Sequence, residues 1–185
     1  MSLASFAQWL QQRDWAQDFS GSPNAYPIVL ATHLTCIALF GGLILLTNLR
    51  LLGWTLRGIP VSHFVQKLRP IKWAGFLIMV TCGGLLAGSE AGKYYINPYF
   101  WTKMSLLVLI GVHALAFRRS VYGNTAALDR AEAMPRAAKV AGALSLILWL
   151  GVVCAGRMIG YYEPEPQGRA HSAAVRTTGS PISQN

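Results

Sequence analysis

The sequence predicts an all-α integral membrane protein: a four-helix bundle with an interfacial amphipathic helix at its N-terminus. Of the 185 residues, 53% are hydrophobic and only 12% are charged, about half the charged fraction of a typical soluble domain. Four long runs contain no Asp, Glu, Lys or Arg: residues 19–49, 73–89, 104–117 and 140–156. About 20 apolar residues span a bilayer, so each run predicts a transmembrane helix. The third and fourth runs reach this length only if they include one basic residue each, Lys103 and Arg157.

The N-terminal segment, residues 1–22, is predicted to hold one amphipathic helix over residues 3–18. Leu3, Phe6 and Leu10 share one helical face, and glutamines surround much of the rest. A helix of this kind lies in the plane of the lipid headgroups. The Gly-Ser-Pro sequence that follows is expected to end it.

Residues 23–162 are predicted to form the membrane domain. Its four spans are expected at residues 26–49, 71–89, 99–117 and 139–162, with a short surface helix between the first two. Aromatic residues at the outer turn that leads into span three form a predicted interfacial belt: Tyr94, Tyr95, Tyr99, Phe100 and Trp101. The rest of the chain, residues 163–185, is rich in Pro, Gly, Ser and Thr and is expected to be a disordered tail.

Basic residues concentrate in two of the connections. Five lie between spans one and two, with no acid among them: Arg50, Arg57, Lys67, Arg69 and Lys72. Five more lie between spans three and four: Arg118, Arg119, Arg130, Arg136 and Lys139. By the positive-inside rule, both connections are cytoplasmic and both termini periplasmic, as in a multi-pass protein of the bacterial inner membrane. Topology and lipid contact thus account for the net charge of +9, and no nucleic-acid partner is expected.

Three ionisable residues from three spans are expected in one layer near the outer surface. His33 lies 17 residues before Arg50, and Lys103 lies 15 residues before Arg118. At about 1.5 Å per residue, the two are level within roughly 3 Å. Arg157 lies at the outer end of span four. Ionisable residues inside membranes are costly, so these three are candidates for function.

A b-type haem suits this set of residues. The imidazole of His33 would bind iron. Arg157 would pair an anionic propionate, and Lys103 would either do the same or, deprotonated by burial, serve as second axial ligand. The adjacent Gly41 and Gly42 leave room for a flat macrocycle, although close helix packing explains glycines equally well.

Other potential ligands are weaker candidates. Met104 and Met158 lie in the outer layer as possible thioether ligands. His113 is ten residues deeper than Lys103, and His63 is its one possible level partner for a second haem. The simpler expectation is that His113 is hydrogen-bonded near the interface.

Two alternatives stay open for the outer layer. His33 could be hydrogen-bonded to a neighbouring helix without any cofactor. The layer could also bind copper, because Cu(I) prefers sulfur ligands and soft donors are scattered through the outer halves of the spans: Cys36, Cys82, Met104, Cys154 and Met158.

Two stretches resemble known membrane families: "THLTCIALFGGLILLTNLRLLGW", beginning at Thr32, and "NPYFWTKMSLLVLIGVHALAFRRSVY", beginning at Asn97. They are similar to HemJ-type protoporphyrinogen oxidases and to the membrane domains of CopD-type copper proteins. They are closest to uncharacterised bacterial four-helix proteins with "DLRLLG" and "GRxIxY" motifs, and here Asn48 replaces the usual Asp. The HemJ resemblance implies haem b bound through His33 and Lys103; it does not carry over the oxidase reaction.

The expected function is therefore electron transfer by a membrane b-type haem protein near the periplasmic face, within a larger redox complex. Quinone or other membrane or periplasmic redox proteins are the expected partners. The alternatives are a CopD-like copper protein and a cofactor-free structural subunit. The sequence has no nucleophile–base pair, carboxylate pair or phosphate loop, so any enzymatic role would be as an oxidoreductase component.

Overall fold

A computed structural model describes residues 2–55, 58, 60–123, 125–131 and 133–163. Within these ranges the chain forms helices and turns and no strand. In chain order the helices are α1 (Leu3–Gln11), α2 (Asp14–Gly21), α3 (Ala25–Leu52), α4 (Val61–Ser89), α5 (Ala91–Tyr95), α6 (Pro98–Ala116), the π-helix η1 (Arg118–Tyr122), α7 (Thr125–Arg130) and α8 (Arg136–Ile159). Most of the predicted tail, residues 164–185, lies outside the described residues.

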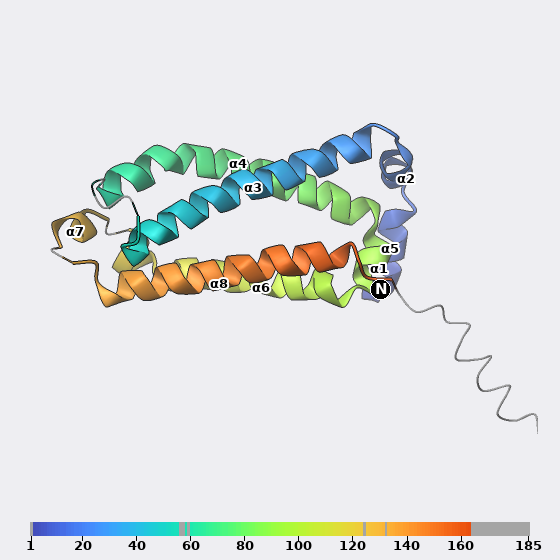
Figure 1. Cartoon of the computed structure of the whole chain (residues 1–185). Coiled ribbons are helices and arrows are strands. Elements are labelled where there is room, and N and C mark those ends of the chain that lie inside the picture. The colour runs from blue at the N-terminus through green and yellow to red at the C-terminus, as the bar shows by residue number, and fades with distance from the viewer. Residues whose placement is uncertain (1, 56–57, 59, 124, 132, 164–185) are drawn as a thin grey trace, which may run out of the picture.

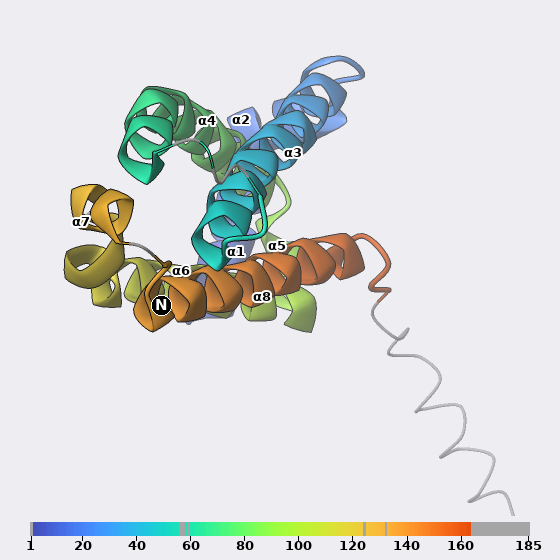
Figure 2. The same ribbon diagram turned by 60° about the vertical axis from the view of Figure 1, so that its left-hand side comes forward.

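Four long helices run side by side and confirm the predicted all-α bundle (Figure 1). α3, α4, α6 and α8 are each long and apolar enough to cross a bilayer. α3 packs along α4, α6 packs along α8, and α3 also contacts α8 (Figure 2). The bundle is therefore two helix pairs joined mainly through α3 and α8.

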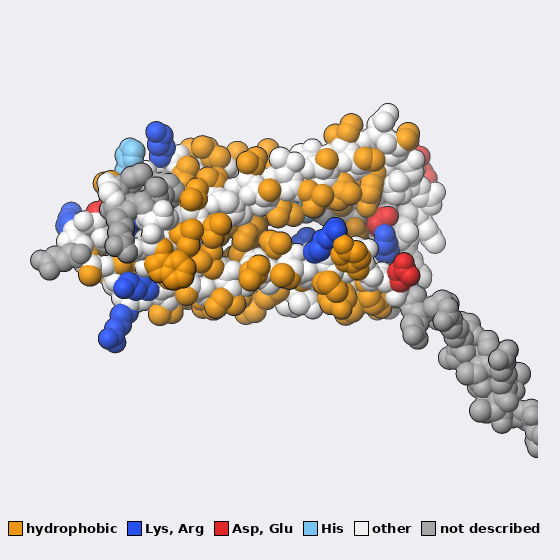
Figure 3. All heavy atoms as spheres, viewed as in Figure 1, with side chains coloured by type: hydrophobic (Ala, Val, Ile, Leu, Met, Phe, Trp, Pro, Cys, Tyr) orange, Lys and Arg blue, Asp and Glu red, His pale blue; other side chains and the backbone are white. Residues whose placement is uncertain are grey.

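The surface of the bundle is apolar, as a membrane protein requires. Large hydrophobic side chains cover the sides of the long helices (Figure 3). Leu39, Val108 and Ile147, from three different helices, are each 66% exposed. Lipid tails solvate such side chains, whereas water would not. The fold is thus that of an integral membrane protein.

α4 is longer than the predicted second span, because it includes the stretch expected as a separate surface helix. The helix begins at Val61 and continues through Pro70. Proline has no N–H to donate to the helical hydrogen bond. In a membrane helix that packs against neighbours, this loss bends the helix more often than it ends it. α4 is visibly bowed (Figure 1).

The N-terminal amphipathic segment forms two helices, and the prediction of one continuous helix was wrong. α1 ends before Gln12, and Arg13 has the extended backbone that begins α2. The guanidinium of Arg13 lies 3.9 Å from the ring centroid of Trp9. This break lets α1 pack on α5 while α2 packs on α3 and α4.

The two ends of the bundle differ. We call the end with α1, α2 and α5 the aromatic end, and the end with the α3–α4 and α6–α8 connections the basic end. A buried hydrophobic cluster lies at the basic end: Leu51, Val61, Val121, Leu128, Ala138 and Ala141. Nearby, a Cβ at Gly142 in α8 would lie 3.1 Å from the backbone oxygen of Asn48 in α3, so the two helices are in close contact here.

From this contact, α3 and α8 diverge toward the aromatic end, as both views show (Figures 1 and 2). Trp149 is the side chain that bridges them near mid-helix. Its indole lies against Gly41, where an added Cβ would be 2.6 Å from the indole Nε1. The indole also meets the ring of Phe40 edge-on, with 5.5 Å between the ring centroids. We call the part of the bundle between Trp149 and the aromatic end the divergent half.

Candidate cofactor site in the divergent half

His33 of α3 makes one hydrogen bond, and that bond fixes its tautomer. Its Nδ1 lies 2.9 Å from the carbonyl oxygen of Met79 in α4. A carbonyl oxygen can only accept, so Nδ1 must carry the proton and donate it. In the neutral ring Nε2 then holds the free lone pair, which is the form in which histidine binds metals.

Gly83 gives the imidazole access to this carbonyl. Gly83 lies one helical turn after Met79, on the same face of α4. A Cβ at position 83 would lie only 2.9 Å from Cε1 of His33. Any larger residue would therefore displace the ring from its partner, and this glycine serves His33 directly.

Lys103 of α6 is the second polar residue in the divergent half. Its side chain runs past Gly156 of α8, where a Cβ would lie 3.8 Å from Nζ. Lys103 lies near enough to His33 for its positive charge to act on the imidazole. His33 and Lys103 come from α3 and α6, which are not neighbouring helices, and no hydrogen bond joins the two side chains in the described part of the chain.

Both of these residues have nitrogen atoms without a partner. Within the described part of the chain, neither Nε2 of His33 nor Nζ of Lys103 takes part in a hydrogen bond, and Lys103 forms no ion pair. Each side chain is only partly buried. Two nitrogen donors from different helix pairs are therefore available to a ligand between them.

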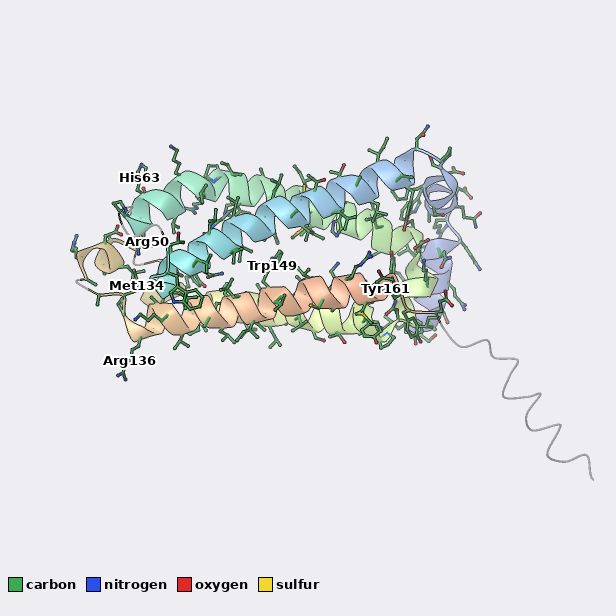
Figure 4. The ribbon with its side chains drawn as sticks, in the orientation of Figure 1. Arg50, His63, Met134, Arg136, Trp149 and Tyr161 are labelled. Atoms are coloured by element: carbon green, nitrogen blue, oxygen red, sulfur yellow. The ribbon has the colours of Figure 1, made fainter. Side chains whose placement is uncertain are left out.

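Arg157 lies in the same outer region but is engaged elsewhere. Its guanidinium donates to the hydroxyl of Tyr161 and lies over that ring, 4.7 Å from the centroid. Tyr161 marks the aromatic end just beyond α8 (Figure 4). Arg157 is exposed, and its described contact is with Tyr161 at the rim of the divergent half.

The two glycines of α3 have different surroundings. The indole of Trp149, which extends from α8 toward α3 (Figure 4), covers Gly41. Nothing lies within 4 Å of a Cβ built at Gly42. Gly41 therefore serves helix packing, the alternative already recognised for glycines, and only Gly42 has open space beside it.

The weaker candidate ligands differ in their surroundings. Met158 is 41% exposed, and Met104 is partly buried on α6. His113 is buried, with Nε2 at 3.1 Å from the carbonyl oxygen of Ala141 in α8 and its ring 5.0 Å from that of Phe117. This is the hydrogen-bonded state expected for His113. His63 is exposed at the start of α4 (Figure 4).

The sulfur donors are also dispersed. Cys36 and Cys82 are partly buried, Cys154 is exposed, and all three are free thiols. Among the described residues, no group of three or more His, Cys, Asp or Glu side chains could hold a metal ion.

Polar side chains close the aromatic end above the candidate site. The Tyr26 hydroxyl donates to Oε2 of Glu90 at 3.3 Å, and Lys93 pairs with the same oxygen at 3.4 Å. Burial, followed by the nearby Tyr26 and Glu90, raises the pKa of Tyr94. These groups tie α3, α4 and α5 together where the bundle is widest.

The sequence analysis missed several residues that shape the bundle. Met79, Gly83 and Trp149 define the surroundings of His33, but no motif singles them out. A second polar set nearer the basic end was also missed: the Asn48 amide donates to Ser145 Oγ at 2.9 Å, and Lys72 donates to Thr47 Oγ1 at 2.6 Å. Thr47 and Asn48 interrupt the apolar run of α3, and this interruption was the sequence signal that could have indicated the second polar set.

No curated protein and no solved structure is detectably similar to the chain. A family of unknown function, DUF6644, matches residues 23–162, the range predicted for the membrane domain. Because the match covers most of the 185 residues, the chain belongs to this family of unknown function, DUF6644.

Proposed function

We propose that this protein is a membrane b-type haem protein that transfers electrons near its aromatic end. The observation that supports the proposal is a pair of nitrogen atoms in the divergent half, Nε2 of His33 and Nζ of Lys103, neither of which has a hydrogen-bond partner among the residues that the structure describes. A cofactor-free bundle has no need to lock a histidine tautomer with its lone pair free, or to keep an ammonium without a counterion in the membrane.

The residues present fit a haem in type. His33 has the neutral tautomer that axial ligation requires, and the Met79 carbonyl orients its ring. Lys103 would provide either the second axial nitrogen or a cation for a propionate. Arg157, exposed at the rim, would exchange its contact with Tyr161 for a propionate.

A haem bound here would supply one-electron redox chemistry. The protein contributes the surroundings. Trp149 and Phe40 form an apolar boundary toward the middle of the bundle, and α1, α2 and α5 cover the aromatic end. These elements limit the access of water, which is one way a protein tunes the potential of a metal centre.

The partners follow from the proposed topology. The basic connections would be cytoplasmic and the aromatic end periplasmic, in a bacterial inner membrane. Electrons would then pass between the site and a quinone in the bilayer or a periplasmic redox protein. The protein would act as one subunit of a larger membrane redox complex, an oxidoreductase component.

An absorption spectrum of the purified full-length protein tests the proposal. Expression in haem-replete cells should give a Soret band and extractable haem b in a molar ratio near one, and His33→Ala should abolish both. Metal analysis of the same sample provides the second readout. Protein without haem would refute the proposal, and bound copper without haem would establish the copper alternative instead.

A further inference from the structure

A pocket of about 510 Å³ lies at the basic end, separate from the His33 region. Its described lining comes from the end of α3, from Gly58 and Pro60 before α4, from α7 and the residues that follow it, and from the start of α8. The lining residues that matter here are Arg50, Leu52, Leu128, Asp129, Met134 and Lys139. Arg50 and Met134 mark this end in Figure 4, whereas Arg136 points away from the bundle.

The pocket has one more positive than negative charge among the side chains named above. Arg50 and Lys139 are cations and Asp129 is the acid. Both carboxylate oxygens of Asp129 accept backbone N–H groups at the start of α4, Oδ1 from Val61 and Oδ2 from Ser62. The acid thus holds α7 on α4, and its charge is offset by these amides and by Arg50.

The rest of the lining is apolar, with Leu52, Leu128 and Met134 from three different segments. A small hydrophilic ion gains nothing from such walls. An amphiphile gains from both parts, because its anionic head pairs with Lys139 while its glycerol and upper chain contact the apolar side chains.

The depth of the pocket suits a lipid headgroup. Arg50 is the first charged residue after the apolar run of α3, and Lys139 is the last one before the apolar run of α8. Both therefore lie where the hydrocarbon core of the bilayer gives way to headgroups. Trp54, 74% exposed just beyond Arg50, is a typical interfacial anchor.

We propose that this pocket binds the phosphodiester headgroup of an anionic phospholipid. Arg50 already acts on Asp129, so Lys139 is the described cation that would meet the single negative charge of a lipid such as phosphatidylglycerol. Lys139 provides the discriminating charge, and Leu52, Leu128 and Met134 contact the glycerol region. The site is independent of the proposed haem function.

Native mass spectrometry of the full-length protein in detergent tests this proposal with phosphatidylglycerol and phosphatidylcholine of identical acyl chains. We expect phosphatidylglycerol to bind about fivefold more tightly, the effect of roughly one favourable lysine–lipid contact. Lys139→Gln should remove the preference and Lys139→Arg should keep it. The matched control is Lys67→Gln, an exposed lysine of α4 outside the pocket, which should change nothing.

Equal binding of the two lipids would overturn the proposal, as would an equal loss of preference in Lys67→Gln and Lys139→Gln. Displacement of phosphatidylglycerol by inorganic phosphate would also overturn it, because it would indicate a site for free anions. Circular dichroism of each variant confirms that the helices are intact. Lys139 is exposed, so its replacement leaves the packing of α8 unchanged.

Discussion

His33 of α3 donates a hydrogen bond from Nδ1 to the carbonyl oxygen of Met79, 2.9 Å away in α4. This contact fixes two properties of the imidazole at once: the position of its proton and the direction of its ring. It exists because Gly83 leaves the space that a side chain would fill. A substitution at position 83 therefore changes the orientation of His33 without replacing any candidate ligand.

Gly83→Ala should disturb the site, and Gly84→Ala should not. The new Cβ at position 83 would lie 2.9 Å from Cε1 of His33, and relieving such overpacking costs about 1–3 kcal/mol. Misorientation of the ligand should also weaken haem binding by about 10–100-fold. Thermal unfolding in detergent and haem titration measure the two effects.

Gly84→Ala is the matched control, since nothing lies within 4 Å of its Cβ. Removing a glycine from a helix interior should stabilise the protein by about 0.5–1 kcal/mol. Equal destabilisation by both substitutions would contradict the role assigned to Gly83.

Lys103→Met should lower haem affinity, whereas Lys67→Met should leave it unchanged. The two lysines lie in the divergent half and at the basic end, respectively. We expect a loss of at least about tenfold for position 103, typical of removing a group that supports a metal centre. A shifted Soret band would identify Lys103 as an iron ligand, and an unshifted band with weaker binding would identify it as a propionate partner.

Unchanged affinity and spectrum in Lys103→Met would separate Lys103 from the haem site altogether. His33→Ala, tested alongside, would then show whether haem is bound through histidine alone.

Asn48 and Ser145 should be energetically coupled across α3 and α8. Asn48 is only 2% exposed, and its amide donates to the Ser145 hydroxyl at 2.9 Å. Hydrogen bonds between membrane helices contribute about 0.6 kcal/mol on average and up to about 1.7. A double-mutant cycle with Asn48→Ala and Ser145→Ala, followed by unfolding in mixed micelles, should give a coupling in this range.

A second cycle with Asn48→Ala and Thr102→Ala should show no coupling. The Thr102 hydroxyl donates within its own helix, to the Pro98 carbonyl, so the two sites share no partner. A coupling near zero for Asn48 and Ser145 as well would mean that this hydrogen bond adds no stability.

Acid should detach α7 from α4. Burial by itself raises the pKa of Asp129, but hydrogen bonds from Ser62 and Val61, together with the charge of Arg50, outweigh it and lower the pKa below its ordinary value of 3.8. The folded-state pKa is depressed, so the stabilising contact is complete above about pH 4 and is lost as the pH falls through the folded-state value.

Amide chemical shifts of Val61 and Ser62, measured by NMR in detergent, should follow this titration. Asp129→Ala should give the acid-state shifts at every pH, and Asp18→Ala, which removes an exposed carboxylate of α2, should leave the titration intact. Shifts that stay constant in the wild-type protein as the pH falls would contradict the assignment.

Charge-free runs were sufficient to predict the four spans, because a bilayer excludes charges over a fixed thickness. The errors arose where that rule does not apply. The first part of α4 holds Lys67 and Arg69, so hydropathy placed it outside the membrane helix although it continues the same helix. The break between α1 and α2 has no Gly or Pro to signal it; it accompanies contacts of Trp15 with Gly88 and of Gln11 with Gly92.

The sequence predicts a depth for the candidate site but none of its contacts. Counting residues from the basic connections placed His33 level with Lys103, because helical rise is constant. The rotation of each helix about its own axis is set by packing, which counting cannot reveal. For this reason Met79 and Gly83 beside His33, Trp149 over Gly41, and the orientation of Arg157 toward Tyr161 emerged only from the structure.

The unequal packing along the bundle has a consequence for how a large ligand would be loaded. The buried cluster and the close contact between Gly142 and Asn48 are at the basic end, whereas α3 and α8 separate beyond Trp149. A chain inserted in the membrane can thus reach its final topology before any cofactor arrives. Insertion of the proposed haem would then be a late step of maturation, with the basic end already folded.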